Sequence, residues 1–247
     1  MTNHFLFAAR RSPSLLPRVS TLFLLAVLAL AFGQSCRPPQ LRLGPGVRLE
    51  SLEGYAFLKI IDARAGVKSK FSFVIQLPDK GRVDVFDALG RSLFTLISEG
   101  PEAYFVAIPK KAYWRGSQHE ILEKFLGFDL SLEEMAGLLS GRWGQGPAAD
   151  GRAFRGWAWT RDARDRVVAG ESGGLRLEVK DFFVGGVQPH TILFTSAHNS
   201  GSIKVYEVKF NVPPKAKPFR LWFLDDFRET TREEMERLLG DEAEVIR

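Results

Sequence analysis

The chain has 247 residues, a formal net charge of +5 at pH 7 and a hydrophobic content of 45%, with aromatic residues at 12%. These proportions are sufficient for a substantial core. Lysine and arginine are interspersed with acids and form no basic block, which argues against a protein that binds nucleic acid.

The first 35 residues have the parts of a secretory signal. Arg10, Arg11 and Arg18 form a positive region, and an apolar run from 22 to 32 follows it. This run is too short to span a bilayer comfortably, because a spanning helix needs about 20 apolar residues. Removal of residues 1–35 leaves 212 residues, which suit one domain, and lowers the formal net charge to +2.

Cys36 is the only cysteine, and it stands where the apolar run stops. Gly33-Gln34-Ser35-Cys36 resembles a lipobox, the site at which a bacterial lipoprotein is cleaved and acylated on cysteine, although Gly33 occupies a place that is usually aliphatic. A single exported cysteine cannot form an internal disulfide, and acylation would remove the unpaired thiol. The alternatives are a signal followed by an incidental cysteine and an uncleaved anchor.

Residues 36–50 are predicted to form the acylated cysteine and a tether, since Pro38-Pro39 and Gly44-Pro45-Gly46 are typical of linkers. Several acyl chains on Cys36 would hold the protein in membrane lipid, whereas one chain binds only marginally. Arg37 follows the cysteine where a bacterial lipoprotein retained at the inner membrane would carry Asp. The resemblance therefore implies the periplasmic face of the outer membrane.

Alternation of side chains after the tether predicts antiparallel strands. From Val67 to Leu77 every second residue is apolar or small, while Lys68 and Lys70 take the other face. Further strands with short connections are predicted over residues 82–86, 92–97 and 103–108. A meander of this kind is typical of a curved sheet or barrel.

Two helices are predicted to interrupt the strands. Residues 118–126 have an apolar face and end at Gly127, and Ser131 begins a capping box with an apolar stripe that ends at Gly141. Helices this short are not stable alone. We therefore expect them to pack across the concave face of the sheet.

The second half of the chain is again rich in predicted strands. They cover Trp157 to Trp159 and residues 166–169, 175–179, 191–195, 202–210 and 219–223. Gly173-Gly174 and Asn199-Ser200-Gly201 are typical of hairpin turns, and a capping box at Thr231 predicts a short C-terminal helix. The predicted class is mainly β with helices (α+β), with a domain over 51–225 and a helical extension over 226–247.

No motif has the setting that catalysis or metal binding requires. Ser172 in Gly170–Gly174 fits G-x-S-x-G, but a strand follows it where a hydrolase has a helix. His119-Glu120 lacks the second histidine of H-E-x-x-H; with Glu123 it could hold a metal or form a solvated charged helix face, and we expect the charged face. His190 and His198 have no partner in the sequence pattern, and the glycine-rich stretch 141–146 lacks the Lys-Ser/Thr of a phosphate loop. We expect no enzymatic activity, no cofactor and no metal.

With catalytic and metal sites set aside, the candidate functional site is the apolar inner face of the predicted sheet. A curved sheet fills its inner face with side chains, helices or ligand. The residues expected to line a cavity there are Phe71, Phe73, Ile75, Val83, Val85, Trp157 and Trp159. An ordinary packed core would use the same residues. Leu89, in a tight connection, is expected to be exposed, although single exposed leucines are common.

These features follow a known order: an acylated cysteine, a strand rich in Phe, a Val/Leu strand with a corner, then two helices. Here the corner is Asp87-Ala88-Leu89-Gly90, and the helical part covers 121–130 and 138–142. Residues 52–143 thereby resemble LolB-type outer-membrane lipoproteins and the wider LolA/LolB lipoprotein-carrier superfamily. Ala88 stands where that family has a corner proline, and the C-terminal part extends beyond the family pattern.

The resemblance implies an unclosed antiparallel β-barrel with helices covering the mouth. It implies that an apolar cavity holds the acyl chains of lipoproteins received from a soluble periplasmic carrier, and that Leu89 enters the outer membrane during their insertion. Two alternatives stay open. One is a protein of the same fold that binds another lipid or hydrophobic ligand, and the other is an interaction lipoprotein with a packed core.

Overall fold

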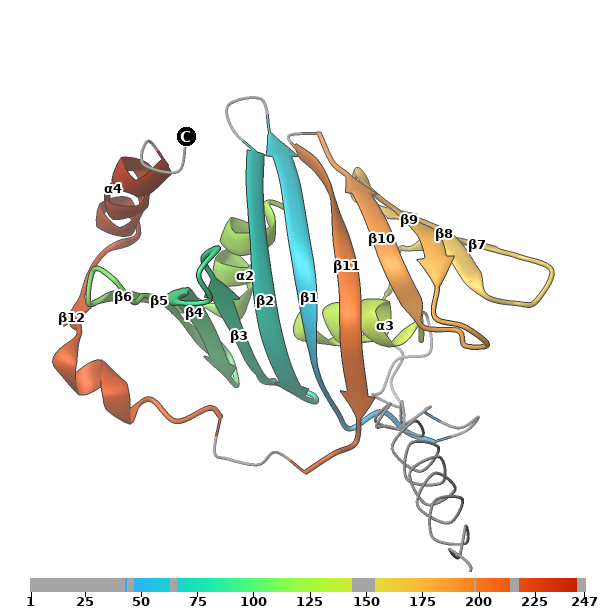
Figure 1. Cartoon of the computed structure of the whole chain (residues 1–247), viewed down its shortest axis with the longest axis horizontal. Coiled ribbons are helices and arrows are strands. Elements are labelled where there is room, and N and C mark those ends of the chain that lie inside the picture. The colour runs from blue at the N-terminus through green and yellow to red at the C-terminus, as the bar shows by residue number, and fades with distance from the viewer. Residues whose placement is uncertain are drawn as a thin grey trace, which may run out of the picture. The chain divides into compact units, whose positions relative to one another are not determined.

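The computed structural model (Figure 1) describes residues 43, 47–62, 66–143, 154–197, 199–213 and 218–243. Cys36, the signal region and His198 lie outside the described residues. The chain from Gln40 to Arg247 is one compact unit, distinct from Met1–Pro39, and all the buried residues described belong to it. This unit therefore carries its own core and can be studied without the first 39 residues.

Twelve strands make up the sheet within the described part of the chain. They are β1 (Ser51–Asp62), β2 (Gly66–Gln76), β3 (Lys80–Phe86), β4 (Ser92–Glu99), β5 (Glu102–Ala107), β6 (Ala112–Ser117), β7 (Ala158–Arg161), β8 (Val167–Ser172), β9 (Leu175–Phe182), β10 (Pro189–Thr195), β11 (Asn199–Phe210) and β12 (Arg228–Glu229). Their order is β12-β6-β5-β4-β3-β2-β1-β11-β10-β9-β8-β7. Only β12 pairs in parallel, with β6. The end strands β12 and β7 are not neighbours, so the sheet is open, which confirms the predicted fold class.

The helices α2 (Gln118–Leu126) and α3 (Leu132–Ser140) lie on one face of the sheet, behind the central strands in Figure 1. Both predicted boundaries are confirmed. Ser117 and Ser131 each form a capping box, and Gly127 and Gly141 end the helices in the left-handed conformation, with φ of 75° and 74°. No helix among the described residues is long and apolar enough to span a membrane.

Strand β1 was not predicted, because its inner positions are partly small. Gly54 and Ala56 face inward, and a bulge between Tyr55 and Ala56 shifts the register against β11. The Phe73 ring of β2 lies over Gly54, and a Cβ there would come within 2.6 Å of it. Glycine at this position thus makes room for the Phe73 ring. It also interrupts the alternation of apolar and polar residues by which a strand is recognised in the sequence. Strands β6 and β12 were also not predicted.

Two local predictions are wrong. The expected turn at Asn199-Ser200-Gly201 is the start of β11, because Gly201 packs directly against the Lys59 carbonyl and the Phe194 ring. The expected strand over 219–223 is replaced by the 3₁₀ helix η1 (Trp222–Asp226). Arg82 of β3 holds the chain around this helix: its guanidinium donates to the Pro218 carbonyl at 3.0 Å and lies over the Phe223 ring.

The C-terminal residues, which the sequence set apart as an extension, pack on the sheet. The Thr230 N–H donates to the Tyr113 carbonyl at 2.8 Å. The predicted helix is present as α4 (Arg232–Ala243), with the Thr231 hydroxyl accepting from the Glu234 N–H at 3.3 Å. Met235 is buried in the core. The segment therefore covers the β6 end of the sheet.

Candidate functional site

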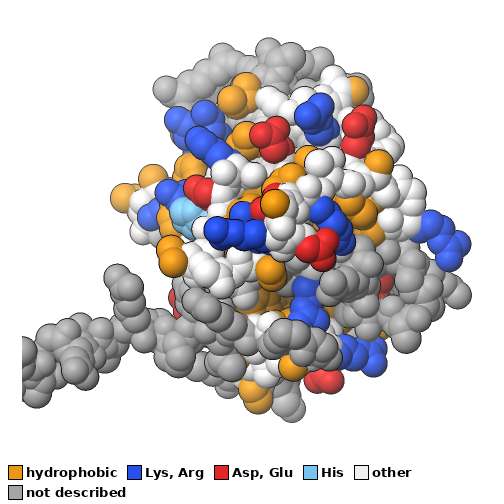
Figure 2. Space-filling view, turned by 90° about the vertical axis from the view of Figure 1, so that its right-hand side faces the viewer, with side chains coloured by type: hydrophobic (Ala, Val, Ile, Leu, Met, Phe, Trp, Pro, Cys, Tyr) orange, Lys and Arg blue, Asp and Glu red, His pale blue; other side chains and the backbone are white. Residues whose placement is uncertain are grey.

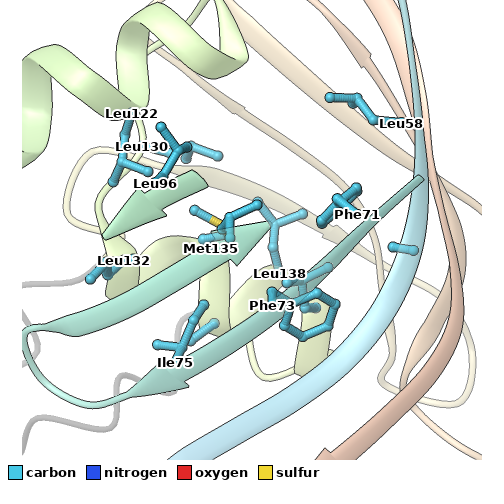
Figure 3. Close-up of a cluster of buried hydrophobic side chains, with 14 of the residues drawn as sticks. Leu58, Phe71, Phe73, Ile75, Leu96, Leu122, Leu130, Leu132, Met135 and Leu138 are labelled. Carbon is cyan, nitrogen blue, oxygen red and sulfur yellow. The ribbon is translucent and has the colours of Figure 1, made fainter. Parts of the chain in front are cut away.

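The candidate site is the apolar interior between the sheet and its helices. Alternation with period two turns one side of each strand inward, and α3 supplies the opposite wall. In Figure 3, Met135 and Leu138 of α3 lie close to Phe71 and Phe73 of β2. The centre of this interior is lined by Leu58, Phe71, Val83, Phe128, Leu130, Met135, Leu138, Leu139, Leu177, Ile192, Phe194 and Ile203.

The interior is almost completely filled by these side chains. The cavity at its centre measures about 20 Å³, which is room for roughly one water molecule and far too little for an acyl chain. All of its lining residues are apolar, and the Phe128 and Phe194 rings are in contact, with centroids 5.0 Å apart. A ligand as large as an acyl chain can enter only if side chains or helices move.

The expected lining residues fall into two groups. Phe71 and Val83 line the central cavity. Phe73, Ile75 and Val85 are buried on the same face of the sheet as parts of its core. Sequence reasoning placed Met135, Leu138 and Leu139 on a helix stripe without assigning them to the site. Ile192 and Phe194 could have been found from the alternation in β10.

Trp157 and Trp159, also expected in the lining, lie at the flank of the interior instead. Their rings stack in parallel with centroids 4.8 Å apart, and Trp143 meets Trp159 edge-on at 5.2 Å. The Trp157 indole N–H donates to the Glu134 carboxylate at 2.9 Å. Both tryptophans are partly buried and pack against the core from the side of the edge strand β7.

Apolar packing holds α3 against the sheet, and seven of its nine residues are buried. At its N-terminal end Leu132 packs on Gly81 of β3, where a Cβ would come within 2.7 Å of the leucine side chain. At its C-terminal end Gly141 packs against the Val187 carbonyl. Between these ends the helix holds its place through the buried faces of its apolar residues. The helix takes part in none of the strand pairs described, so this packing is its main attachment to the sheet.

Helix α2 is tied to its surroundings by polar contacts at the surface. His119 lies 2.7 Å from the Asp129 carboxylate in the α2–α3 connection, and Lys124 lies 2.9 Å from Glu236 of α4. The Ser117 hydroxyl and N–H both donate to Glu120, which holds the pKa of that carboxyl below its ordinary value. These exposed pairs contribute little to stability, so α2 relies mainly on Ile121 and Leu122, which are buried.

Leu89 lies in the β3–β4 loop and is 80% exposed. The Asp87 carboxylate accepts hydrogen bonds from the N–H groups of Leu89 and Arg91, both at 2.9 Å, and from Arg91 Nε at 2.7 Å. The bond from the Arg91 backbone is the main reason why the pKa of Asp87 lies below its ordinary value. Gly90, with a φ of 82°, completes the turn. The loop thus presents Leu89 to solvent in a defined conformation.

The remaining candidates are placed on the surface. Ser172 ends β8 and leads into the turn at Gly173 and Gly174, after which β9 follows. His190 has a partner that the sequence did not reveal, because cross-strand pairing brings Asp181 to 3.0 Å from its Nδ1. Within the described residues there is no group of three or more His, Cys, Asp or Glu side chains that could hold a metal ion.

No protein-family model matches the chain, and no curated protein matches it in sequence. Among solved structures it is similar to a LolA superfamily protein from Nitrosomonas europaea, with 11% identity and a TM-score of 0.43 over 76% of this chain and 93% of that one. It is also similar to a proposed outer membrane lipoprotein-sorting protein domain from Vibrio parahaemolyticus, with 10% identity and a TM-score of 0.48 over 70% and 91% of the two chains. A DUF1329 family protein from Desulfovibrio piger has 12% identity and a TM-score of 0.45 over 71% and 92%. At these scores the similarities assign neither a family nor a function.

Proposed function

We propose that this chain is a lipoprotein anchored through Cys36 at the periplasmic face of the outer membrane, where it binds acyl chains of other lipoproteins and aids their insertion. The observation that carries the proposal is the wholly apolar interior under α2 and α3. The resemblance of residues 52–143 to LolB-type lipoproteins supports it. The proposed role needs no covalent step and no cofactor.

Binding would exchange one apolar contact for another. When α3 moves away, Met135, Leu138 and Leu139 lose their contacts with the sheet, and an acyl chain takes their place. Each buried CH₂ contributes about 0.8 kcal/mol, so a long chain can compensate for the displaced helix. The interior remains dry in both states, and a soluble periplasmic carrier is the proposed donor.

Leu89 is proposed to contact the membrane during delivery. Its side chain is 80% exposed, and the Asp87 hydrogen bonds fix the loop that carries it. An aliphatic side chain on a rigid turn can enter the lipid without exposing backbone groups of the sheet. Acyl chains released near this point would pass directly into the bilayer.

Native mass spectrometry of the Gln40–Arg247 unit with a synthetic triacylated lipopeptide tests acyl binding. A disulfide between Gly81→Cys and Leu132→Cys, whose formation is verified by mass, tests whether α3 must move, since the Leu132 side chain lies directly beside the position that a Cβ at Gly81 would take. This unit contains no native cysteine. We expect a stoichiometric complex with the reduced double variant and none with the oxidised one. The two single variants under oxidising conditions are the controls.

The packed interior favours a second candidate, an interaction lipoprotein whose core has only a structural role. A void of about 20 Å³ is what such a core would contain. This candidate predicts no lipopeptide complex in the reduced, oxidised or unmodified protein. Competition by phospholipid distinguishes a third case: retention of phospholipid without lipopeptide would indicate a protein of this fold that binds another lipid.

A further inference from the structure

Four lysines gather on the face of the sheet that points away from α2 and α3. Lys59 belongs to β1, Lys68 and Lys70 to β2, and Lys204 to β11, and these three strands lie side by side in the middle of the sheet (Figure 1). Lys59 is the direct cross-strand partner of Lys68, and Phe57 stands between Lys70 and Lys204 in the next row. We call this group the lysine patch.

No ion pair neutralises the lysine patch in the part of the chain that the structure describes. The nearby acids on the same face pair with other bases: Glu53 and Glu207 with Lys209, at 3.7 and 2.8 Å, and Asp84 with Arg82, at 2.8 Å. Like charges directly opposite each other on neighbouring strands are destabilising. The fold gains nothing visible from this arrangement, which suggests that the charges have an external partner.

The opposite end of the sheet has a different charge pattern. On the side that Figure 2 shows, toward β7 and β8 in Figure 1, basic and acidic side chains are interspersed. Arg166 lies 2.7 Å from Asp162, and Arg161 lies 3.6 Å from Asp165. The lysine patch is therefore a local feature and does not reflect a uniformly basic surface.

Apolar and aromatic side chains accompany the lysines. Ile61 is 49% exposed and Tyr206 is 45% exposed, and the Lys204 ammonium lies 5.7 Å from the centre of the Tyr206 ring. Lysine stems extend along apolar surface while their charges stay in water, and tyrosine is suited to the boundary between water and lipid. A polar acidic protein surface would offer no partner for Ile61.

We infer that the lysine patch binds an anionic phospholipid surface. Charge complementarity and the apolar side chains among the lysines both favour lipid headgroups with their adjoining acyl chains. Lys70 is the cross-strand partner of Phe86, the last residue of β3 before the Leu89 loop. The patch therefore adjoins the end of the sheet at which Leu89 is exposed. The inference does not depend on acyl binding in the interior.

Vesicle flotation with the Gln40–Arg247 unit tests the inference. The probes are vesicles of phosphatidylcholine alone and of phosphatidylcholine with phosphatidylglycerol. We expect binding only to the anionic vesicles and its loss at high salt. The variant Lys68→Gln/Lys70→Gln should bind about thirtyfold less tightly. The control variant Arg176→Gln/Lys180→Gln removes the same charge from the same face at β9 and should bind as the unmodified protein does.

Three results would overturn the inference: equal binding to both kinds of vesicle, no binding to either, or equal losses in the two double variants. Thermal unfolding verifies that both variants are folded. The salt and lipid dependence of the unmodified protein tests the inference even if a variant does not fold. Lipopeptide binding is measured separately. Failure to bind anionic vesicles would therefore leave the proposed acyl binding untouched, and failure to bind lipopeptide would leave the lysine-patch inference untouched.

Discussion

Replacement of Phe71 by Ala separates a binding interior from a packed one, because Phe73 provides a matched control. The two rings lie on the same strand and face, and their exposed fractions are 4% and 1%. Phe71 lines the central cavity, whereas Phe73 lies over Gly54 of β1. The two substitutions thus delete the same group at similarly buried positions, but only Phe71 lines the central cavity directly.

Both substitutions should reduce stability by about 3–5 kcal/mol, the usual cost of truncating a buried phenylalanine to alanine. This loss is a large part of the total of about 5–15 kcal/mol that is normal for a domain. Denaturant unfolding of the Gln40–Arg247 unit measures it as a lower midpoint with an unchanged slope. A loss below about 1 kcal/mol on Phe71→Ala would contradict a packed interior.

Lipopeptide binding should respond more strongly to Phe71→Ala than to Phe73→Ala. The enlarged cavity lets an acyl chain enter with less displacement of α3, so the complex should be retained more strongly than with the unmodified protein. Phe73→Ala should raise retention less, because Phe73 is not among the residues that line the central cavity. Equal retention in the two variants, under conditions where both are folded, would refute the assignment of the site to the centre of the interior.

Leu89→Glu should leave lipopeptide binding intact and abolish transfer of the lipopeptide to vesicles, because only the membrane contact changes. Transfer that survives the substitution would contradict the proposed contact of Leu89 with the membrane. Asp87→Ala should free the Leu89 and Arg91 N–H groups, seen as faster amide hydrogen exchange, whereas unchanged exchange would mean that Asp87 does not order the loop. Since the pKa of Asp87 is lowered in the fold, its stabilising effect should persist above about pH 4 and disappear as the pH falls through the lower, folded-state value. Ser131→Ala should cost about 1 kcal/mol through loss of the α3 cap, measured as a lower unfolding midpoint; an unchanged midpoint would argue against the capping role.

Local signals in the sequence predicted most of the elements. Clean alternation located β2, and the Ser and Gly residues at the ends of α2 and α3 located both helices. Tertiary packing hid the others. Gly54 and Gly201 resemble interruptions of a strand, yet at each a backbone carbonyl and a neighbouring aromatic ring occupy the space that a Cβ would need.

The sequence by itself determined an apolar face on the strands that alternate cleanly, such as β2, together with two capped helices and a tight loop with Leu89, because these depend on spacing and on local backbone chemistry. Only the tertiary structure decided how full the interior is, since a cavity is the small difference between the volume enclosed and the side chains within it. The lysine patch likewise required the pairing of β2, β1 and β11, which brings residues as distant as Lys59 and Lys204 into adjoining rows.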